Sequence, residues 1–165
     1  MPMRPDKKFL LNHPAHLLAF GFGAGLLPKA PGTWGTLVAL PIFALVRVGG
    51  GDTVAVIAVA VLFFVLGVWA AGVAGRALGV ADHGGIVIDE IAAFLLVLAC
   101  TPASIAWWVI AFLLFRVFDI VKPWPISWAD RTIKGGFGVM FDDVLAAGYT
   151  IGVILLLRAL ADAII

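Results

Sequence analysis

The sequence predicts an all-α protein, a polytopic integral membrane bundle of about four to five membrane-embedded helices. Hydrophobic residues make up 63% of the 165-residue chain and charged residues 13%, against roughly 25% charged in ordinary soluble domains. The mean hydropathy is +1.13. The length predicts one domain over residues 1–165. Eleven of the 21 Asp, Glu, Lys and Arg residues lie in three patches, 82–90, 116–134 and 142–143.

Apolar stretches supply the expected helices, at 36–48, 53–75, 91–100, 105–121 and 144–165. The stretch 53–75 is the clearest, because it is long enough to cross a bilayer and carries no charge. The stretches 36–48 and 91–100 are short for roughly 30 Å of hydrocarbon at 1.5 Å per residue. The sequence leaves open whether these two are extended by flanking residues, tilted or half-buried.

Alternating these helices across a bilayer brings the three charge patches to one membrane face. The turns at 49–52 and 101–104 fall on one side, and the segments 76–90 and 121–143 fall on the other together with the N-terminal segment. Nine of the eleven Lys and Arg residues lie on or near that second side, which the positive-inside rule makes cytoplasmic. The N-terminal segment is expected to be retained against the membrane, because polar residues and glycines interrupt its apolar core.

Two pairs of adjacent carboxylates are the first candidates for chemistry. Asp89-Glu90 precedes an apolar run, and Asp142-Asp143 follows a glycine-rich turn. Asp142 is the expected N-cap of the helix that begins after this turn. Capping explains one acid of each pair, since acids in a first turn stabilise a helix by about 0.3–1 kcal/mol. A second acid at a membrane boundary is costly, and Mg2+ binds through carboxylates, water and phosphate oxygens. His83 is expected to be a structural hydrogen-bonding residue.

The segment 115–123 carries charge on one face of a predicted helix. Arg116 and Asp119 are three residues apart and share that face, which Lys122 extends. The alternative is a self-neutralising ion pair. However, two cations for one acid leave positive charge for an anion, and arginine donates to phosphate through a planar fork. Arg131, in the following loop, is first interpreted as solvated surface that could reach a phosphate.

The Gly- and Pro-rich segment 21–36 is a third candidate. Its backbone N–H groups, with a helix beginning near Thr33, could form a phosphate cradle. The alternative, which composition alone favours, is a turn with Thr33 as an ordinary N-cap. The segment is not a P-loop, because no Gly-Lys-Ser/Thr follows the glycines.

Several other classes of chemistry find no support. The net charge of +1 and the lack of a basic stripe give no reason to expect nucleic acid. Cys100 is alone, cannot form an intrachain disulfide and is expected to be a small buried residue. The chain has no Cys-x5-Arg loop, no Asp-x-Asp nucleophile motif and no Gly-x-Ser-x-Gly elbow. A metal-activated water is the mechanism that remains.

With these residues in view, the chain resembles the phosphatidylglycerophosphatase A family over most of its length. The resemblance rests on His16-Leu17-Leu18-Ala19, Pro-x-x-Pro-Gly-Thr-x-Gly at 28–35, Asp82-His83-Gly84, Asp89-Glu90, Phe115-Arg116-x-x-Asp119-x-x-Lys122-Pro123-x-Pro125-Ile126, Asp130-Arg131 and Gly135-Gly136-x-Gly138-x-Met140-x-Asp142-Asp143-x-x-Ala146. One departure is Ala92-Ala93, where family members often have glycine. Alanine is small enough to preserve close packing there.

The resemblance implies a Mg2+-dependent phosphatase of the bacterial inner membrane. Such an enzyme removes the terminal phosphate of phosphatidylglycerophosphate at the cytoplasmic face, with that lipid and the bilayer as its partners. The implied catalytic residues are Asp89, Glu90, Asp119 and Asp143. The implied metal ligands are Asp89, Glu90, Asp119, Asp142 and Asp143. The implied phosphate-binding residues are Arg116, Lys122, Arg131 and Thr33.

Two alternatives stay open at this point. One is another metal-dependent membrane phosphotransferase, although the Asp-Gly-x-x-Ala-Arg motif expected of a CDP-alcohol transferase is absent. The other is a Mg2+ or proton transporter. The clustering of the acids at one face argues against a transporter, because intramembrane acids that line a path would be spread along it.

Overall fold

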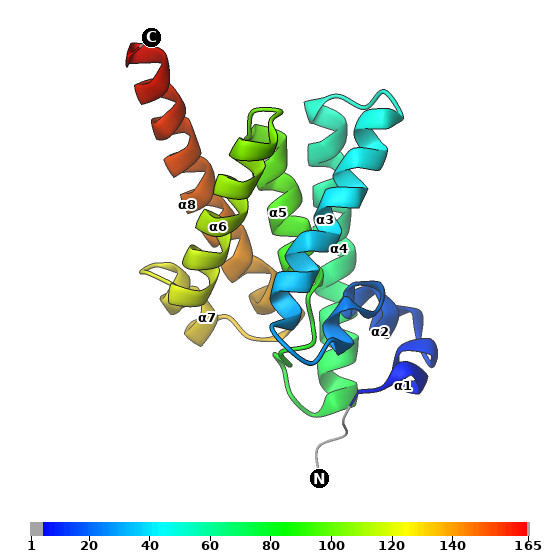
Figure 1. Ribbon diagram of the computed structural model, residues 1–165. Helices are drawn as coiled ribbons and strands as arrows, with labels where there is room; N and C mark the ends of the chain where they lie inside the picture. Colours follow the sequence, from blue (N-terminus) through cyan, green and yellow to red (C-terminus); the bar gives the residue numbers. More distant parts are fainter. Residues whose placement is uncertain (1–4, 165) are drawn as a thin grey trace.

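The computed structural model describes residues 5–164, and this part of the chain is entirely helical apart from its turns and loops (Figure 1). This confirms the predicted all-α class. The elements are α1 (Lys7–Leu11), α2 (Pro14–Ala19), the 3-10 helix η1 (Gly21–Leu26), α3 (Pro31–Val48), α4 (Thr53–Leu78), α5 (Ile88–Cys100), α6 (Ile105–Val121), α7 (Ile126–Thr132) and α8 (Gly135–Ile164).

The long helices run between two ends of the molecule, as the predicted alternation requires (Figure 1). The α3–α4 and α5–α6 turns lie at one end, which we call the far end. The short helices α1, α2 and α7 lie at the opposite end together with the loop 79–87, and we call this the polar end. The three segments expected on one membrane face therefore meet at one end of the bundle.

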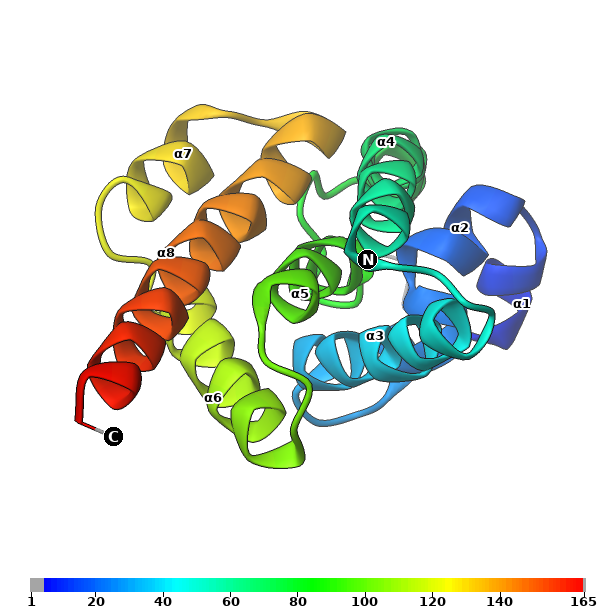
Figure 2. The ribbon, with the colours of Figure 1, turned by 90° about the horizontal axis from the view of Figure 1, so that it is seen from above.

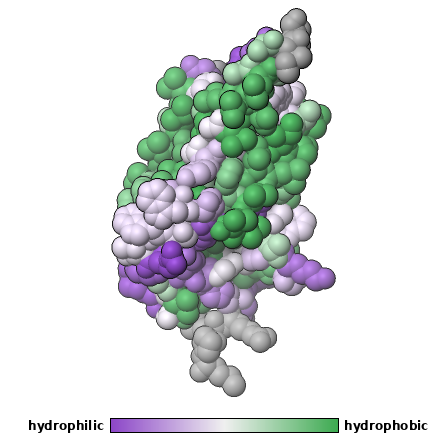
Figure 3. Space-filling model, turned by 90° about the vertical axis from the view of Figure 1, so that its left-hand side faces the viewer, coloured by the Kyte–Doolittle hydropathy of each residue, from purple (hydrophilic) through white to green (hydrophobic). Residues whose placement is uncertain are grey.

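Within residues 5–164, three helices are long and apolar enough to cross a membrane, namely α3, α4 and α8. Many large apolar side chains on these helices and on α6 are exposed, including Leu45, Val65 and Leu156. In Figure 3, hydrophobic side chains cover the upper part of the molecule and hydrophilic ones gather toward the polar end. An apolar surface of this kind is stable in contact with lipid rather than water.

The short helix α5 lies at the centre of the bundle. It packs against α3, α4, α6 and α8, which surround it when the molecule is viewed from above (Figure 2). Its 13 residues extend over about 20 Å, and Phe94, Leu95 and Leu98 are completely buried. The open question about the stretch 91–100 is thereby answered, since this segment is enclosed by other helices. Cys100, expected to be buried, is exposed, because it is the last residue of α5 at the far end.

Three helices begin earlier than the sequence predicted. α3 begins at Pro31 rather than residue 36, α5 at Ile88 rather than residue 91, and α8 at Gly135 rather than residue 144. Asp142 therefore lies well inside α8, and its predicted role as an N-cap is wrong. The glycines before it were interpreted as a flexible turn, yet Gly136 packs against α4 so closely that a Cβ there would overlap the Val68 carbonyl. Close helix contact, not flexibility, explains that glycine.

Candidate active site

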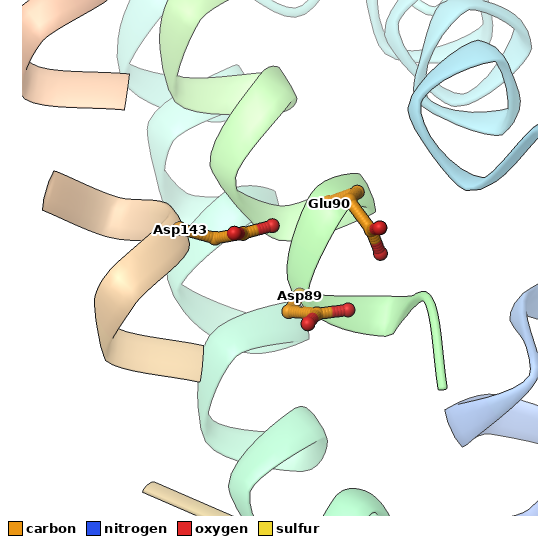
Figure 4. Close-up of side chains that lie close together, drawn as sticks. All are labelled: Asp89, Glu90 and Asp143. Atoms are coloured by element: carbon orange, nitrogen blue, oxygen red, sulfur yellow. The ribbon is translucent and has the colours of Figure 1, made fainter. Parts of the chain in front are cut away.

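Three carboxylates from two helices meet near the polar end (Figure 4). Asp89 and Glu90 belong to the first turn of α5, and Asp143 comes from α8. Each offers an oxygen, and these oxygens all lie within 4.8 Å of one another. The residues are only 9%, 8% and 3% exposed, respectively. Both predicted acid pairs thus contribute to one cluster, which we call the acid triad.

The acid triad has unused ligand atoms. Asp89 Oδ1, Glu90 Oε2 and Asp143 Oδ2 are buried and accept no hydrogen bond from the described part of the chain. A buried polar atom without a partner costs about 1–3 kcal/mol, and more if it is charged. Three such oxygens side by side repel one another unless a cation lies among them. Hard carboxylate oxygens are the ligands that Mg2+ and similar divalent ions prefer, so these residues fit such an ion.

Arg116 joins the acid triad to α6 and α3. Its Nη1 lies 2.6 Å from Asp119 Oδ2 and 3.6 Å from Glu90 Oε1. The same nitrogen donates a 3.4 Å hydrogen bond to Thr36 Oγ1, and Nε has no hydrogen-bond partner among residues 5–164. Asp119 is also close enough for its charge to act on Glu90 and Asp143. The predicted face of α6 is therefore directed at the acids from α5 and α8.

Lys122 forms a second group beside the acid triad. It ends α6 in a left-handed conformation with φ of 46°, and its Nζ lies 2.7 Å from Asp130 Oδ1 and 2.5 Å from Asp142 Oδ2. Burial acts to lower the pKa of Lys122, but the two carboxylates raise it above its usual value. The hydrogen bond from Lys122 lowers the pKa of Asp130. Lys122 therefore stays protonated at neutral pH and neutralises Asp142.

The whole cluster keeps a negative charge. Six carboxylates adjoin two cations, which leaves four negative charges in excess when all are ionised; the acids are Asp89, Glu90, Asp119, Asp130, Asp142 and Asp143, and the cations are Arg116 and Lys122. Such an excess inside a protein is unfavourable unless a cation is bound. A cation bound among the acids would also offset the charge of a phosphate, which the acids alone would repel.

The start of α3 adjoins this cluster. A Cβ on Gly32 would overlap Glu90 Oε1 and would lie 3.1 Å from both terminal nitrogens of Arg116. Thr33 is half-buried in the first turn of α3, where its N–H donates to the Ala30 carbonyl at 2.9 Å. Ala30 is the N-cap residue, so the alternative that made Thr33 the N-cap is wrong. The Gly- and Pro-rich segment does lead into the site.

Two residues of the site were not identified from the sequence. Gly32 leaves room for Glu90 and Arg116, and Thr36 accepts the hydrogen bond from Arg116 while donating one of 2.9 Å to the Gly32 carbonyl. The available signal was the Pro-Gly-Thr run itself, from which only Thr33 was selected. Nothing in the chain order indicates that this run meets a helix 80 residues later.

Arg131 and His83 lie outside the cluster. Arg131 is exposed, and its Nε donates a 3.0 Å hydrogen bond to the Ser127 carbonyl. His83 Nδ1 accepts a 3.0 Å hydrogen bond from the N–H of Gly85, which agrees with its expected structural role. The phosphate-binding roles of Arg131, Lys122 and Thr33 stay predictions.

A Gly32→Ala variant is expected to lose roughly ten- to a hundredfold in kcat/KM, because the new methyl group displaces Glu90 and Arg116 and small displacements in a site are costly. The same substitution at Gly152 is the matched control, since a Cβ there meets nothing within 4 Å. Steady-state assays of both purified variants measure the difference. Equal activity of the two variants would show that the close approach at Gly32 has no part in the site.

Comparison with known proteins places these features in a family context. A family described as phosphatidylglycerophosphatase A matches residues 17–158. A protein named phosphatidylglycerophosphatase A from Haemophilus influenzae is 45% identical over 152 residues, which covers 91% of this chain and 92% of the relative. A protein of the same name from Escherichia coli is 39% identical over 145 residues, covering 87% and 83%.

A third relative carries a different name. This protein from Bacteroides thetaiotaomicron, provisionally named phosphatidylinositol-3-phosphatase, is 38% identical over 147 residues, which covers 81% of this chain and 87% of the relative. No solved structure matches the fold.

Proposed function

The chain belongs to the phosphatidylglycerophosphatase A family, and from this premise we propose that its acid triad acts with Mg2+ on the terminal phosphate of phosphatidylglycerophosphate. Membership makes the protein a lipid phosphomonoesterase of phospholipid biosynthesis. The reaction transfers a phosphoryl group to water and releases phosphatidylglycerol. The proposal also includes the identity of the metal, the roles of individual residues and the membrane face on which the site lies.

The observation that carries the metal assignment is the set of unused oxygens in the acid triad. Asp89, Glu90 and Asp143 each keep one buried oxygen that has no hydrogen-bond partner in the described part of the chain, and the three residues lie close enough to bind one ion. Asp119 and Asp142 are the remaining candidates. Each already pairs with a cation, Arg116 and Lys122 respectively, so we assign them a supporting place around the three ligands.

We assign each residue of the cluster a separate role in phosphate hydrolysis. When bound, Mg2+ would supply a Lewis acid that polarises the phosphate and lowers the pKa of a water molecule. Arg116, with its unpartnered Nε, is placed to donate to the phosphate oxygens as charge develops on them. A water oxygen bonds to phosphorus as the bond from phosphorus to the glycerol oxygen breaks. One carboxylate of the cluster accepts a proton of that water, and the glycerol oxygen leaves with the electron pair of the broken bond and takes up a proton, which gives the hydroxyl group of phosphatidylglycerol.

Lys122, Arg131 and Thr33 are the further phosphate-binding candidates. Lys122 adds positive charge at the edge of the cluster, where Asp130 and Asp142 hold it. The backbone at the start of α3, around Thr33, contributes the positive end of the helix dipole. Arg131 is exposed at the polar end, so it would act on the headgroup before the headgroup reaches the cluster.

Phosphate release by the detergent-purified protein tests the proposal. With phosphatidylglycerophosphate and Mg2+ we expect turnover, with EDTA we expect none, and Asp89→Asn is expected to be inactive under both conditions. A wild-type rate in EDTA would contradict the metal assignment. Uptake of Mg2+ by proteoliposomes without phosphatase activity would instead support a transporter.

We further propose that the polar end faces the cytoplasm from the inner membrane. Most Lys and Arg residues lie at or near this end, as the positive-inside rule requires of a cytoplasmic face. Exposed tryptophans also occur here, Trp34 at the start of α3 and Trp124 and Trp128 around α7. Tryptophan is enriched at the headgroup level of membranes, and this supports a site within reach of a lipid phosphate.

The native Cys100 provides the test of orientation. It is exposed at the far end of α5 and is the only cysteine in the chain. A membrane-impermeant maleimide is expected to label Cys100 in intact spheroplasts, where only the outer face is accessible, and to spare it in inside-out vesicles. A Cys100→Ser variant controls for labelling elsewhere. Labelling confined to inside-out vesicles would reverse the proposed orientation.

A further inference from the structure

Two adjoining apolar depressions form a groove between α3 and α6. Its larger part has a volume of about 780 Å³ and is lined mainly by α3, from Leu40 to Val48, with Trp108 of α6 opposite. A smaller part of about 210 Å³ adjoins it and is lined by Leu37 and Leu40 of α3 and by α6 as far as Phe112. The two parts share Leu40 and Trp108, so they form one feature, which we call the α3–α6 groove.

The groove ends at the active site. Leu37 follows Thr36 directly, and Phe112 lies one helical turn before Arg116. Thr36 and Arg116 bridge α3 and α6 by their 3.4 Å hydrogen bond. The hydrogen bond between Thr36 and Arg116 therefore lies at the end of the apolar lining. A molecule lying in the groove would have its end beside the guanidinium group of Arg116.

The dimensions and chemistry of the groove suit a hydrocarbon chain. From residue 37 to residue 48, α3 rises about 16 Å, roughly half of the 30 Å hydrocarbon core of a bilayer. The lining is apolar except for Arg47, whose guanidinium group lies over the Phe43 ring at 5.2 Å near the far end. The groove is thus apolar over about the depth of one leaflet. At the end nearest the acid triad it meets the positively charged side chain of Arg116.

We propose that the α3–α6 groove seats an acyl chain of the lipid substrate while the phosphate lies at Arg116. This inference rests on the proposed function and names the part of the protein that recognises the lipid portion of the substrate. The acyl chain would contact the groove and the phosphate would contact Arg116. Together these two contacts would hold the scissile phosphate at a fixed depth. A phosphate monoester without acyl chains would keep only the polar contact.

An Ala44→Trp variant tests the proposal by filling the middle of the groove. For diacyl phosphatidylglycerophosphate we expect kcat/KM to fall by about tenfold or more, because several methylene groups lose their apolar contacts. For the deacylated compound, glycerophosphoglycerophosphate, we expect the variant to stay within about twofold of wild type, since that compound does not use the groove. The selective loss on the diacyl substrate is the diagnostic result.

Gly152→Trp is the matched control. Gly152 lines a different apolar depression, on α8, and has free space around it. This variant is expected to hydrolyse both substrates like wild type. If Ala44→Trp reduces both rates equally, or changes neither, the groove does not seat an acyl chain and holds ordinary bilayer lipid at most. If the wild-type protein hydrolyses neither substrate, it is the proposed function that fails.

A second measurement uses the wild-type protein, so it does not depend on how the variants fold. A phosphatidylglycerophosphate with a photoreactive diazirine in one acyl chain is irradiated with the protein, and the crosslinked peptides are identified by mass spectrometry. We expect crosslinks on α3 between residues 37 and 48 and on α6 between residues 105 and 112. An excess of unlabelled substrate should suppress them. Crosslinks confined to the α8 face around residues 144–156 would overturn the proposal.

Discussion

An Asp143→Asn variant is expected to lose phosphate release by roughly a thousandfold or more, a loss as severe as that expected of Asp89→Asn. The variant keeps the size of the side chain but removes the negative charge from a residue that is 3% exposed and holds an unpartnered oxygen. The amide of asparagine is a weak ligand for a divalent cation. The two remaining acids, Asp89 and Glu90, are not expected to hold the ion without Asp143. Initial rates at saturating Mg2+ measure the loss.

The thermal stability of the same variant separates metal binding from folding. In EDTA, Asp143→Asn is expected to melt at the same temperature as wild type or higher, because one of three crowded negative charges is gone. The increase in Tm on adding Mg2+ should shrink, since stabilisation by a ligand follows its affinity. A large drop of Tm in EDTA would show that Asp143 supports the fold instead.

Asp162→Asn is the matched control for Asp143→Asn. Both acids belong to α8, but the Asp162 side chain is 74% exposed and only approaches Arg158 at 3.9 Å. This variant should have wild-type activity and the full Mg2+-dependent rise in Tm. Wild-type turnover in Asp143→Asn would remove Asp143 from the proposed set of ligands.

An Arg116→Lys variant is expected to lose about a hundredfold in kcat/KM, although the charge is retained. Arg116 contacts Asp119, Glu90 and Thr36 through its guanidinium group, and its Nε is still free for a phosphate oxygen. A lysine ammonium is a point charge that cannot span these partners in one plane. Substrate titrations of the purified variant would give kcat and KM separately.

Arg131→Lys is the same substitution at the exposed arginine and serves as its comparison. We expect only a small change there, because the Arg131 side chain bonds to the Ser127 carbonyl and does not reach the cluster. If Arg131→Lys reduced activity strongly and Arg116→Lys did not, the phosphate would have to bind at Arg131, outside the cluster. The pair of variants therefore locates the phosphate.

Much of the fold could be predicted from local properties of the sequence. The uncharged stretch 53–75 marks α4, which the structure extends only to Leu78, and the alternation of helices brought the right segments to one end. The early start of α8 could not be predicted, because Gly136 looks like a turn residue until the carbonyl of Val68 is known to lie against it. Such a contact between distant segments outweighs local preference.

The sequence predicted which residues belong to the candidate site better than it predicted which of them contact one another. Acids and cations that are costly in an apolar chain were correctly interpreted as neighbours, and the structure brings Asp89, Glu90 and Asp143 together. The sequence contained no sign that Lys122 would bind Asp142, 20 residues away. It also did not reveal Gly32 as the neighbour of Glu90, since that contact depends on how α3 crosses α5.

The division of the acid triad between α5 and α8 has a consequence for the order of synthesis. Asp89 and Glu90 are made before Asp143, which belongs to α8. At about 5–20 residues per second, several seconds separate the two parts. During that interval the chain holds only two of the three acids. If the acid triad holds the metal as proposed, activity begins only when α8 packs, and a chain truncated before α8 is expected to be inactive.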